Sequence, residues 1–207
     1  MASEKPALNP LGFTRQAIAK YPDPVLLKKA QPIVEHTWLA ASDGVLTHTD
    51  NRLVGVSQLA QSMLWLMNEL NALGIAAPQV YRSVQLVVVR KKWSYSPFTT
   101  LYHTILHPAT WDDIIVMCDP KVTFLGMPVT SFEGCLSLPG RMYTVVRNKQ
   151  ILVDYDELTF IDDKFRLDRQ CQEYTGMVAT IIQHEVDHLN GILINATGVP
   201  HEEKTSS

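Results

Sequence analysis

Residues 175–191, TGMVATIIQHEVDHLNG, carry the clearest structural pattern in the chain. Their apolar side chains recur every three or four residues, at Val178, Ile181, Ile182, Val186 and Leu189. This spacing places them on one face and predicts an amphipathic helix from Thr175 to Asn190. Gly191 stands where a C-terminal cap is expected, because glycine readily adopts the left-handed conformation that ends many helices.

A second amphipathic helix is predicted earlier in the chain, over Val56–Asn71 with Ser57 as its N-cap. Its apolar side chains also recur at three- and four-residue spacing, at Leu59, Met63, Leu66, Met67 and Leu70. Between the two helices, the run VQLVVVR (84–90) predicts a buried strand. Shorter runs at 116–118, 122–124, 145–146 and 151–155 also predict strands. Short strands with one helix before them and one after indicate an α+β fold.

The composition excludes several classes of protein. The chain has 207 residues, 46% of them hydrophobic, and a formal net charge of −3. These values argue against disorder and against a nucleic-acid-binding protein, which usually carries a basic excess. No apolar run approaches the roughly 18 residues of a membrane span. Three cysteines without a secretory signal favour a reducing compartment over a disulfide framework.

The strongest chemical signal is the motif HEVDH at residues 184–188. His184 and His188 are four residues apart, so they project from the same helix face and can share a metal ion. Glu185 can then reach a metal-bound water as general base. The alternative is that both histidines are ordinary polar or core residues of the helix.

A catalytic site with two histidine ligands needs a third protein ligand and an open position. Position 194 is Ile and only 207 − 188 = 19 residues follow His188, so the third ligand is expected upstream. The candidates are Cys118, Cys135, Cys171, His103 and His107. Cys135 is the best placed, since it lies between a predicted strand and a turn, whereas Cys118 is expected to be a buried thiol.

Three segments resemble the signature motifs of the peptide deformylase family, in the family's order: LGIAAPQ (73–79), EGCLSLPG (133–140) and QHEVDHLNG (183–191). The segment IAKYPDPVLLKKAQPIVE (18–35) also resembles the family's usual start. The resemblance implies short, mainly antiparallel β-sheets around a central C-terminal helix that carries HExxH, with an N-terminal helix packed on them. It also implies one catalytic domain over 18–195, with a loose leader over 1–17 and a polar tail over 196–207. Insertions are expected at about 37–53 and 91–113.

The resemblance implies a hydrolase that removes the formyl group from N-formyl-methionine at the start of new polypeptides and releases formate. One divalent metal ion would be held by Cys135, His184 and His188, natively Fe²⁺, with Zn²⁺, Ni²⁺ or Co²⁺ accepted. Metal-bound water would attack the formyl carbon, with Glu185 as general base and acid. The side-chain amide of Gln79 and the backbone N–H of Leu136 would stabilise the oxyanion.

The resemblance also implies how substrate binds. The peptide would lie extended between Leu73–Gly74 and Gly134, and the methionine side chain would enter a pocket beside Met177 and Ile181. Glu133 is placed among the substrate-binding residues, and its pairing with Arg147 would brace the Cys135 segment. The expected partners are N-formyl-methionyl peptides or nascent chains, with transient ribosome association, no direct nucleic acid and no membrane. The expected location is cytoplasmic, with an organellar one left open.

The chain departs from the family pattern at Ala72, where many members have glycine. A left-handed backbone at that position would strain an alanine. Two other functions remain in consideration: a metalloprotease that cuts internal peptide bonds, and a peptide-binding relative whose insertions have reshaped the cleft and abolished turnover.

Overall fold

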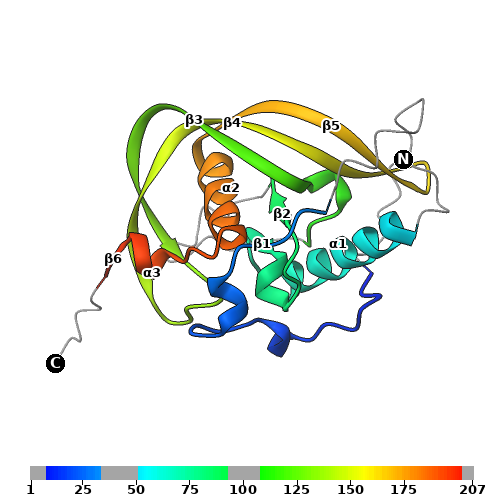
Figure 1. The fold of residues 1–207 in the computed structure, drawn as a ribbon, viewed down its shortest axis with the longest axis horizontal. Coiled ribbons are helices and arrows are strands. Elements are labelled where there is room, and N and C mark those ends of the chain that lie inside the picture. The colour runs from blue at the N-terminus through cyan, green and yellow to red at the C-terminus, as the bar shows by residue number, and fades with distance from the viewer. Residues whose placement is uncertain (1–7, 34–50, 93–107, 202–207) are drawn as a thin grey trace.

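A computed structural model describes residues 8–33, 51–92 and 108–201 (Figure 1). Its antiparallel sheet has the order β1-β2-β3-β4-β5, and a short strand β6 pairs with β4. The strands are β1 (Gly74–Ala76), β2 (Leu86–Arg90), β3 (Ile114–Gly134), β4 (Met142–Ile161), β5 (Lys164–Thr175) and β6 (Val199–Pro200). The helices are α1 (Asn51–Glu69), α2 (Gly176–Leu189) and α3 (Ile194–Thr197). The expected α+β class, with an antiparallel sheet and a C-terminal helix, is confirmed.

Strand β2 is buried on both faces between the two long helices. Leu86 and Val88 belong to the apolar cluster that contains α1, whereas Val87 and Val89 belong to the cluster that contains α2. Because alternate side chains of a strand point to opposite faces, a strand covered on both sides must be apolar throughout. This explains the unbroken LVVV run in the sequence.

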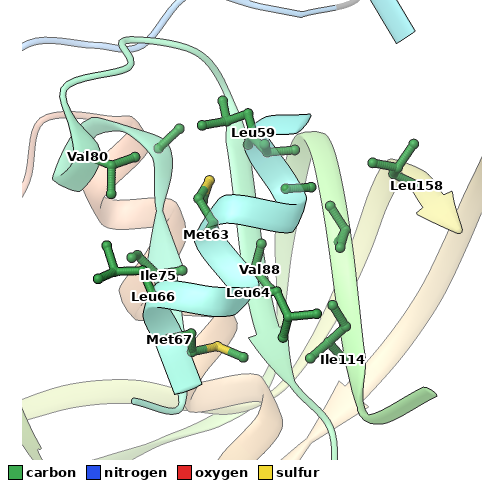
Figure 2. Packing of buried hydrophobic residues seen from close by; sticks show 14 of the residues in the cluster. Leu59, Met63, Leu64, Leu66, Met67, Ile75, Val80, Val88, Ile114 and Leu158 are labelled. Carbon is green, nitrogen blue, oxygen red and sulfur yellow. The ribbon is translucent and has the colours of Figure 1, made fainter. Parts of the chain in front are cut away.

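Helix α1 packs on the sheet through one apolar face (Figure 2). Its fully buried side chains include Met63, Leu64, Leu66 and Met67. They belong to the same cluster as Ile75, Val88 and Ile114, from three neighbouring strands. Burying each such side chain contributes about 1.5–3 kcal/mol to the free energy of folding. Packing of this apolar face, rather than helix propensity, therefore stabilises α1.

Strands β3 and β4 are much longer than the short strands expected from the sequence, and together with β5 they arch over α2 (Figure 1). The inner face of β4 carries buried side chains such as Val145, Ile151 and Val153, while the outer face is more accessible. Register shifts interrupt the β3–β4 pairing between Cys118 and Lys121 and between Leu125 and Pro128. Such irregularities bend strands, which fits the curvature here. The short-strand expectation was wrong because it counted only the apolar segments.

Helix α2 ends as the sequence predicts. Gly191 has φ +73°, its N–H donates to the His188 carbonyl at 3.2 Å, and the Ile192 N–H donates to the Asp187 carbonyl at 2.9 Å. These two bonds form a Schellman cap. A side chain at position 191 would also meet the backbone carbon of Leu27 at 2.8 Å. The site therefore requires glycine for conformation and for space.

Several boundaries differ from the expectations. Helix α1 begins at Asn51, so Ser57 is a buried residue inside the helix and not its N-cap. Residues 51–53, the end of the first expected insertion, belong to this helix. In the leader, Phe13 is buried in the α1 cluster, so the leader packs on the domain at this residue. The tail forms the end of α3 and then β6, which pairs with Tyr143 and Thr144 of β4.

The rest of the two expected insertions, residues 37–50 and 93–107, lies outside the described residues, as do residues 1–7 and 202–207. The division into a domain over 18–195 with flanking segments stays a prediction. Ala72 is not among the described residues with positive φ, whereas its neighbour Asn71 has φ +53°. The alanine is therefore not strained. None of the helices in the described part of the chain has the length and apolar character to cross a membrane.

The cap at Gly191 yields a stability prediction. Gly191→Ala is expected to lower the free energy of unfolding by about 3 kcal/mol, because left-handed backbone costs alanine about 1 kcal/mol and the overlap with Leu27 adds about 2. Gly176→Ala is the control at the other end of α2, since Gly176 has φ +61° but a methyl group there would meet no atom of another segment within 4 Å. It is expected to cost about 1 kcal/mol. Urea unfolding measures both, and equal losses would contradict the steric argument.

Candidate metal centre and adjoining cleft

Three potential metal ligands meet beneath the curved sheet. The ligand atoms of Cys135, His184 and His188 all lie within 4.8 Å of one another. Cys135 follows β3 directly, and the two histidines lie one turn apart on α2 with ring centroids 5.2 Å apart. The Cys135 Sγ is 3.3 Å from the His188 Nε2. Within the described ranges, no other group of three such side chains is close enough to hold a metal ion.

The other candidates for third ligand do not join this group. Cys118 is fully buried in the α1 cluster, as expected for a structural thiol. Cys171 is exposed on β5. His103 and His107 lie outside the described residues. A thiolate and two imidazoles form a donor set that both Zn²⁺ and Fe²⁺ accept, so the residues present fit such an ion.

A buried ion-pair network surrounds the candidate ligands. Arg147 on β4 donates from Nε and Nη2 to the two carboxylate oxygens of Glu133, at 2.8 Å each. Its Nη1 donates to Asp187 on α2 at 2.5 Å. The second Glu133 oxygen also lies 2.9 Å from the Nδ1 of His184. That contact occupies Nδ1 and leaves the His184 Nε2 for a metal, an arrangement typical of metal-binding histidines.

The network shifts the pKa values of its members. Burial alone would raise the pKa of Glu133, but the hydrogen bonds and charge of Arg147 and His184 lower it to about 2. Its contribution to stability is therefore present above the ordinary value of 4.5 and is lost as the pH falls toward 2. Burial alone would lower the pKa of His184, but Cys135 and Glu133 raise it to about 10. Burial lowers the pKa of His188, and the charge of His184 lowers it further.

Glu185 is a buried carboxylate without a full set of partners. Its Oε2 is buried and has no hydrogen-bond partner among the described residues. Burial raises its pKa to about 7. A side chain at Gly74 would meet Glu185 Oε1 at 2.5 Å, so strand β1 lies directly against this carboxylate. A buried acid whose pKa is near neutrality is well suited to proton transfer.

A cavity of about 640 Å³ opens beside Glu185. Its wall contains every residue that the sequence placed in the site except His188 and Arg147, which are buried behind it. The lining includes Leu73, Gly74, Gln79, Glu133, Gly134, Cys135, Leu136, Met177, Ile181 and His184. Met177 is 40% exposed and Ile181 is buried. Both carboxylate oxygens of Glu133 are engaged by protein groups and the residue also lines the cavity, so its place among the substrate-binding residues stays a prediction.

Two residues with hydrogen-bond donors line this cavity from separate loops. The Gln79 Oε1 accepts a bond from the Ala76 N–H at 2.9 Å, which turns the Gln79 NH₂ toward Ser137 Oγ at 3.3 Å and Cys135 Sγ at 3.9 Å. In the described part of the chain, the Leu136 N–H has no hydrogen-bond acceptor. An unsatisfied N–H and a directed amide at one cavity wall can stabilise a developing negative charge.

Sequence reasoning missed three residues that contact the site. Asp187 accepts the third bond of Arg147, and its position between the two histidines of HEVDH was the available signal. Ser137 lies within the EGCLSLPG segment and accepts a bond from Gln79. Lys20 donates to the Leu136 carbonyl at 2.6 Å, and nothing in the local sequence indicates this contact.

Comparisons with known proteins agree on one family. The family model described as "Polypeptide deformylase" matches residues 15–203. The chain is 33% identical over 181 residues to a peptide deformylase of Thermodesulfovibrio yellowstonii, covering 86% of this chain and 85% of that protein. It is 31% identical over 150 residues to a peptide deformylase of Dictyoglomus thermophilum, covering 72% of this chain and 81% of that protein. It is also similar to the Met-Ala-Ser-bound crystal structure of class I type b peptide deformylase from Acinetobacter baumannii, with TM-score 0.64, 31% identity, and 87% and 96% coverage.

The ligand cluster yields a metal-binding prediction. Metal-free protein titrated with Co²⁺ is expected to bind one ion and to show a sulfur-to-metal charge-transfer band. Cys135→Ala is expected to abolish the band and to weaken binding more than about 100-fold, because a direct ligand contributes more than the groups that only orient ligands. Cys171→Ala, the exposed cysteine of β5, is the matched control and should bind normally. An unchanged band in Cys135→Ala would exclude this thiolate as a ligand.

The buried ion pair yields a stability prediction. Arg147→Met is expected to lower the free energy of unfolding by about 3–5 kcal/mol, because it leaves Glu133 buried without its charged partner. The control is Arg169→Met, which removes an exposed arginine 3.4 Å from Asp156 and should cost about 0.5 kcal/mol. Denaturant unfolding of both variants gives the comparison. If Arg147→Met lowers the free energy of unfolding as little as Arg169→Met does, the buried network does not stabilise the fold as proposed.

Proposed function

The chain belongs to the polypeptide deformylase family, and we propose that it releases formate from N-formyl-methionyl peptides with the residues of this cleft. As a member of that family it is a hydrolase, and the family acts on formylated N-termini of new polypeptides. The observation that carries the proposed mechanism is the buried carboxylate of Glu185, which has an unpartnered oxygen beside the Cys135–His184–His188 group.

We assign Cys135, His184 and His188 as the ligands of one divalent metal ion, natively Fe²⁺, with Zn²⁺, Ni²⁺ or Co²⁺ as alternatives. The close approach of their ligand atoms and the family's metal dependence support this assignment. A divalent ion bound there would lower the pKa of a coordinated water, so that hydroxide is available near neutral pH. The bond between His184 Nδ1 and Glu133 keeps the His184 ring in place for this role.

Glu185 is the proposed proton carrier. It takes the proton of the water that attacks the formyl carbon and passes it to the amine that leaves. Burial supports this role by raising the pKa of Glu185 to about 7, so that both protonation states are accessible near neutral pH. Gly74 supports it as well, because the absence of a side chain there leaves room for the carboxylate.

Leu136 and Gln79 are the proposed oxyanion donors. As the formyl carbon becomes tetrahedral, its oxygen gains negative charge, and fixed donors stabilise that charge best when they need no reorganisation. The Leu136 N–H has no acceptor in the described part of the chain. The bond from Ala76 to the Gln79 Oε1 fixes the direction of the Gln79 NH₂.

The peptide is proposed to lie extended between β1 and the end of β3, with backbone pairing at Leu73–Gly74 and at Gly134. Such strand addition holds a peptide through its main chain and reads little sequence. The methionine side chain would rest against Ile181 and Met177, which line the same cavity. Transient association with the ribosome and a cytoplasmic or organellar location also belong to the proposal, because the family's substrates are new polypeptides.

The role of Glu185 is tested by Glu185→Gln. Formate release from formyl-Met-Ala-Ser under anaerobic conditions with Fe²⁺ is expected to fall about 1,000-fold, because an amide cannot take up the proton. Metal content should stay at one ion per chain. Glu173→Gln, an exposed glutamate of β5 bonded to Gln150 at 2.7 Å, is the control and should retain full turnover.

Full turnover by Glu185→Gln would overturn the assigned role. Tight binding of the formyl peptide by the wild type without formate release would instead favour the non-catalytic peptide-binding function. Cleavage of an unformylated, N-terminally blocked peptide would favour the metalloprotease.

A further inference from the structure

A short N-terminal segment joins the two loops that carry the proposed oxyanion donors. The Ala19 N–H donates to the Gln79 carbonyl at 2.8 Å, and the Tyr21 N–H donates to the Ser137 carbonyl at 3.0 Å. Between them, the Lys20 Nζ donates to the Leu136 carbonyl at 2.6 Å. Residues 19–21 therefore contact Gln79 and Leu136, which carry the proposed oxyanion donors, and Ser137 next to Leu136.

The two loops need such a connection. Gln79 belongs to the turn after β1, whereas Leu136 belongs to the turn after β3. Between the side chain of Gln79 and the second turn, the direct contacts are long, at 3.3 Å to Ser137 Oγ and 3.9 Å to Cys135 Sγ. An oxyanion hole requires its donors at a fixed separation, and a misplacement of 1 Å can cost about 100-fold in rate.

Buried side chains anchor the segment that connects the two loops. Ile18 and Ala19 are buried at 3% and 0% exposure, and Leu26 shortly after is fully buried. The Asp23 side chain accepts a bond from the Val25 N–H at 2.9 Å and so caps the following turn. Lys20 itself is exposed and is one of the residues that line the cavity. Because its backbone is anchored on both sides, its side chain can hold Leu136 in place.

Resting on the proposed function, we propose that Lys20 is a positioning residue for deformylation. Its charge-assisted bond to the Leu136 carbonyl fixes the Cys135–Ser137 turn, so that the Leu136 N–H points at the site of the developing oxyanion. Lys20 acts through Leu136, and its effect falls on the transition state more than on peptide binding. The positive charge of Lys20, which lines the cavity, also stabilises the negative charge that develops on the formyl oxygen.

Lys20→Met tests this role, because methionine keeps an apolar stem but cannot donate. With Fe²⁺-loaded protein and formyl-Met-Ala-Ser, kcat is expected to fall about ten-fold, less than a 1 Å misplacement would cost. The KM, the Kd of the product Met-Ala-Ser, the metal content and the melting temperature are expected to stay near wild type. Lys20→Arg, which keeps a charged donor, should restore most of kcat. Lys29→Met, an exposed lysine outside the cavity wall, is the matched control.

A kcat of Lys20→Met equal to that of the wild type would overturn the proposal. So would loss of metal or a lower melting temperature in proportion to the lost activity, which would make Lys20 merely structural. A rise in KM with unchanged kcat would assign the ammonium to peptide binding instead. An Fe²⁺-loaded wild type that releases no formate would contradict the proposed function itself, and the role of Lys20 with it.

Discussion

The arrangement of the site depends on one buried arginine. Arg147 is 5% exposed and bonds to Glu133 at 2.8 Å and to Asp187 at 2.5 Å. A buried charge is tolerated only when its partners are in place, so β3, β4 and α2 must meet in one geometry. Cys135 lies two residues after Glu133, and Asp187 lies next to His188. The same constraint that satisfies the guanidinium thus brings a thiol and two imidazoles together.

The sheet supplies the frame for this network. Strand β2, buried between α1 and α2, fixes the position of β1 through the pairing of Gly74 with Val89. The curved hairpin of β3 and β4 arches over α2 (Figure 1). It carries Glu133 and Arg147, which contact His184 and Asp187 of this helix. As a result, the cleft lies between the end of β3 on one side and the short strand β1 on the other. Packing of apolar side chains therefore sets the width of the cleft in which a peptide would lie.

The sequence predicted the elements whose apolar side chains follow a clear period. Helix α2 has such a period, and the strand predicted at 84–90 has an unbroken apolar run; both lie within two residues of their predicted bounds, and the cap lies at Gly191 as predicted. Strand β5 was not predicted, because most of its side chains are polar and exposed, and only Phe165 and Tyr174 are buried. The lengths of β3 and β4 were underestimated for a similar reason. Their outer faces and the bend near Gly126 and Pro128 interrupt the apolar signal that marks a strand.

Some parts of the candidate site could be predicted from the sequence, and others could not. Motifs identified the group of Cys135, His184 and His188, because metal ligands must be particular residue types at particular spacings. Contacts between distant segments were less accessible: a bond from Lys20 to a backbone carbonyl depends on where two loops meet, and no residue type marks it. The close approach of Gly74 to Glu185 is of the same kind, since only the fold brings them together.

Deformylation by this chain is proposed to require a metal ion held by Cys135, His184 and His188. Metal-free protein titrated with Fe²⁺ under anaerobic conditions, with formate release from formyl-Met-Ala-Ser measured at each addition, tests this requirement. We expect activity to rise in proportion to bound iron and to reach a plateau at one ion per chain. Formate release that does not depend on added metal, or a protein that binds one ion per chain and releases no formate, would contradict it.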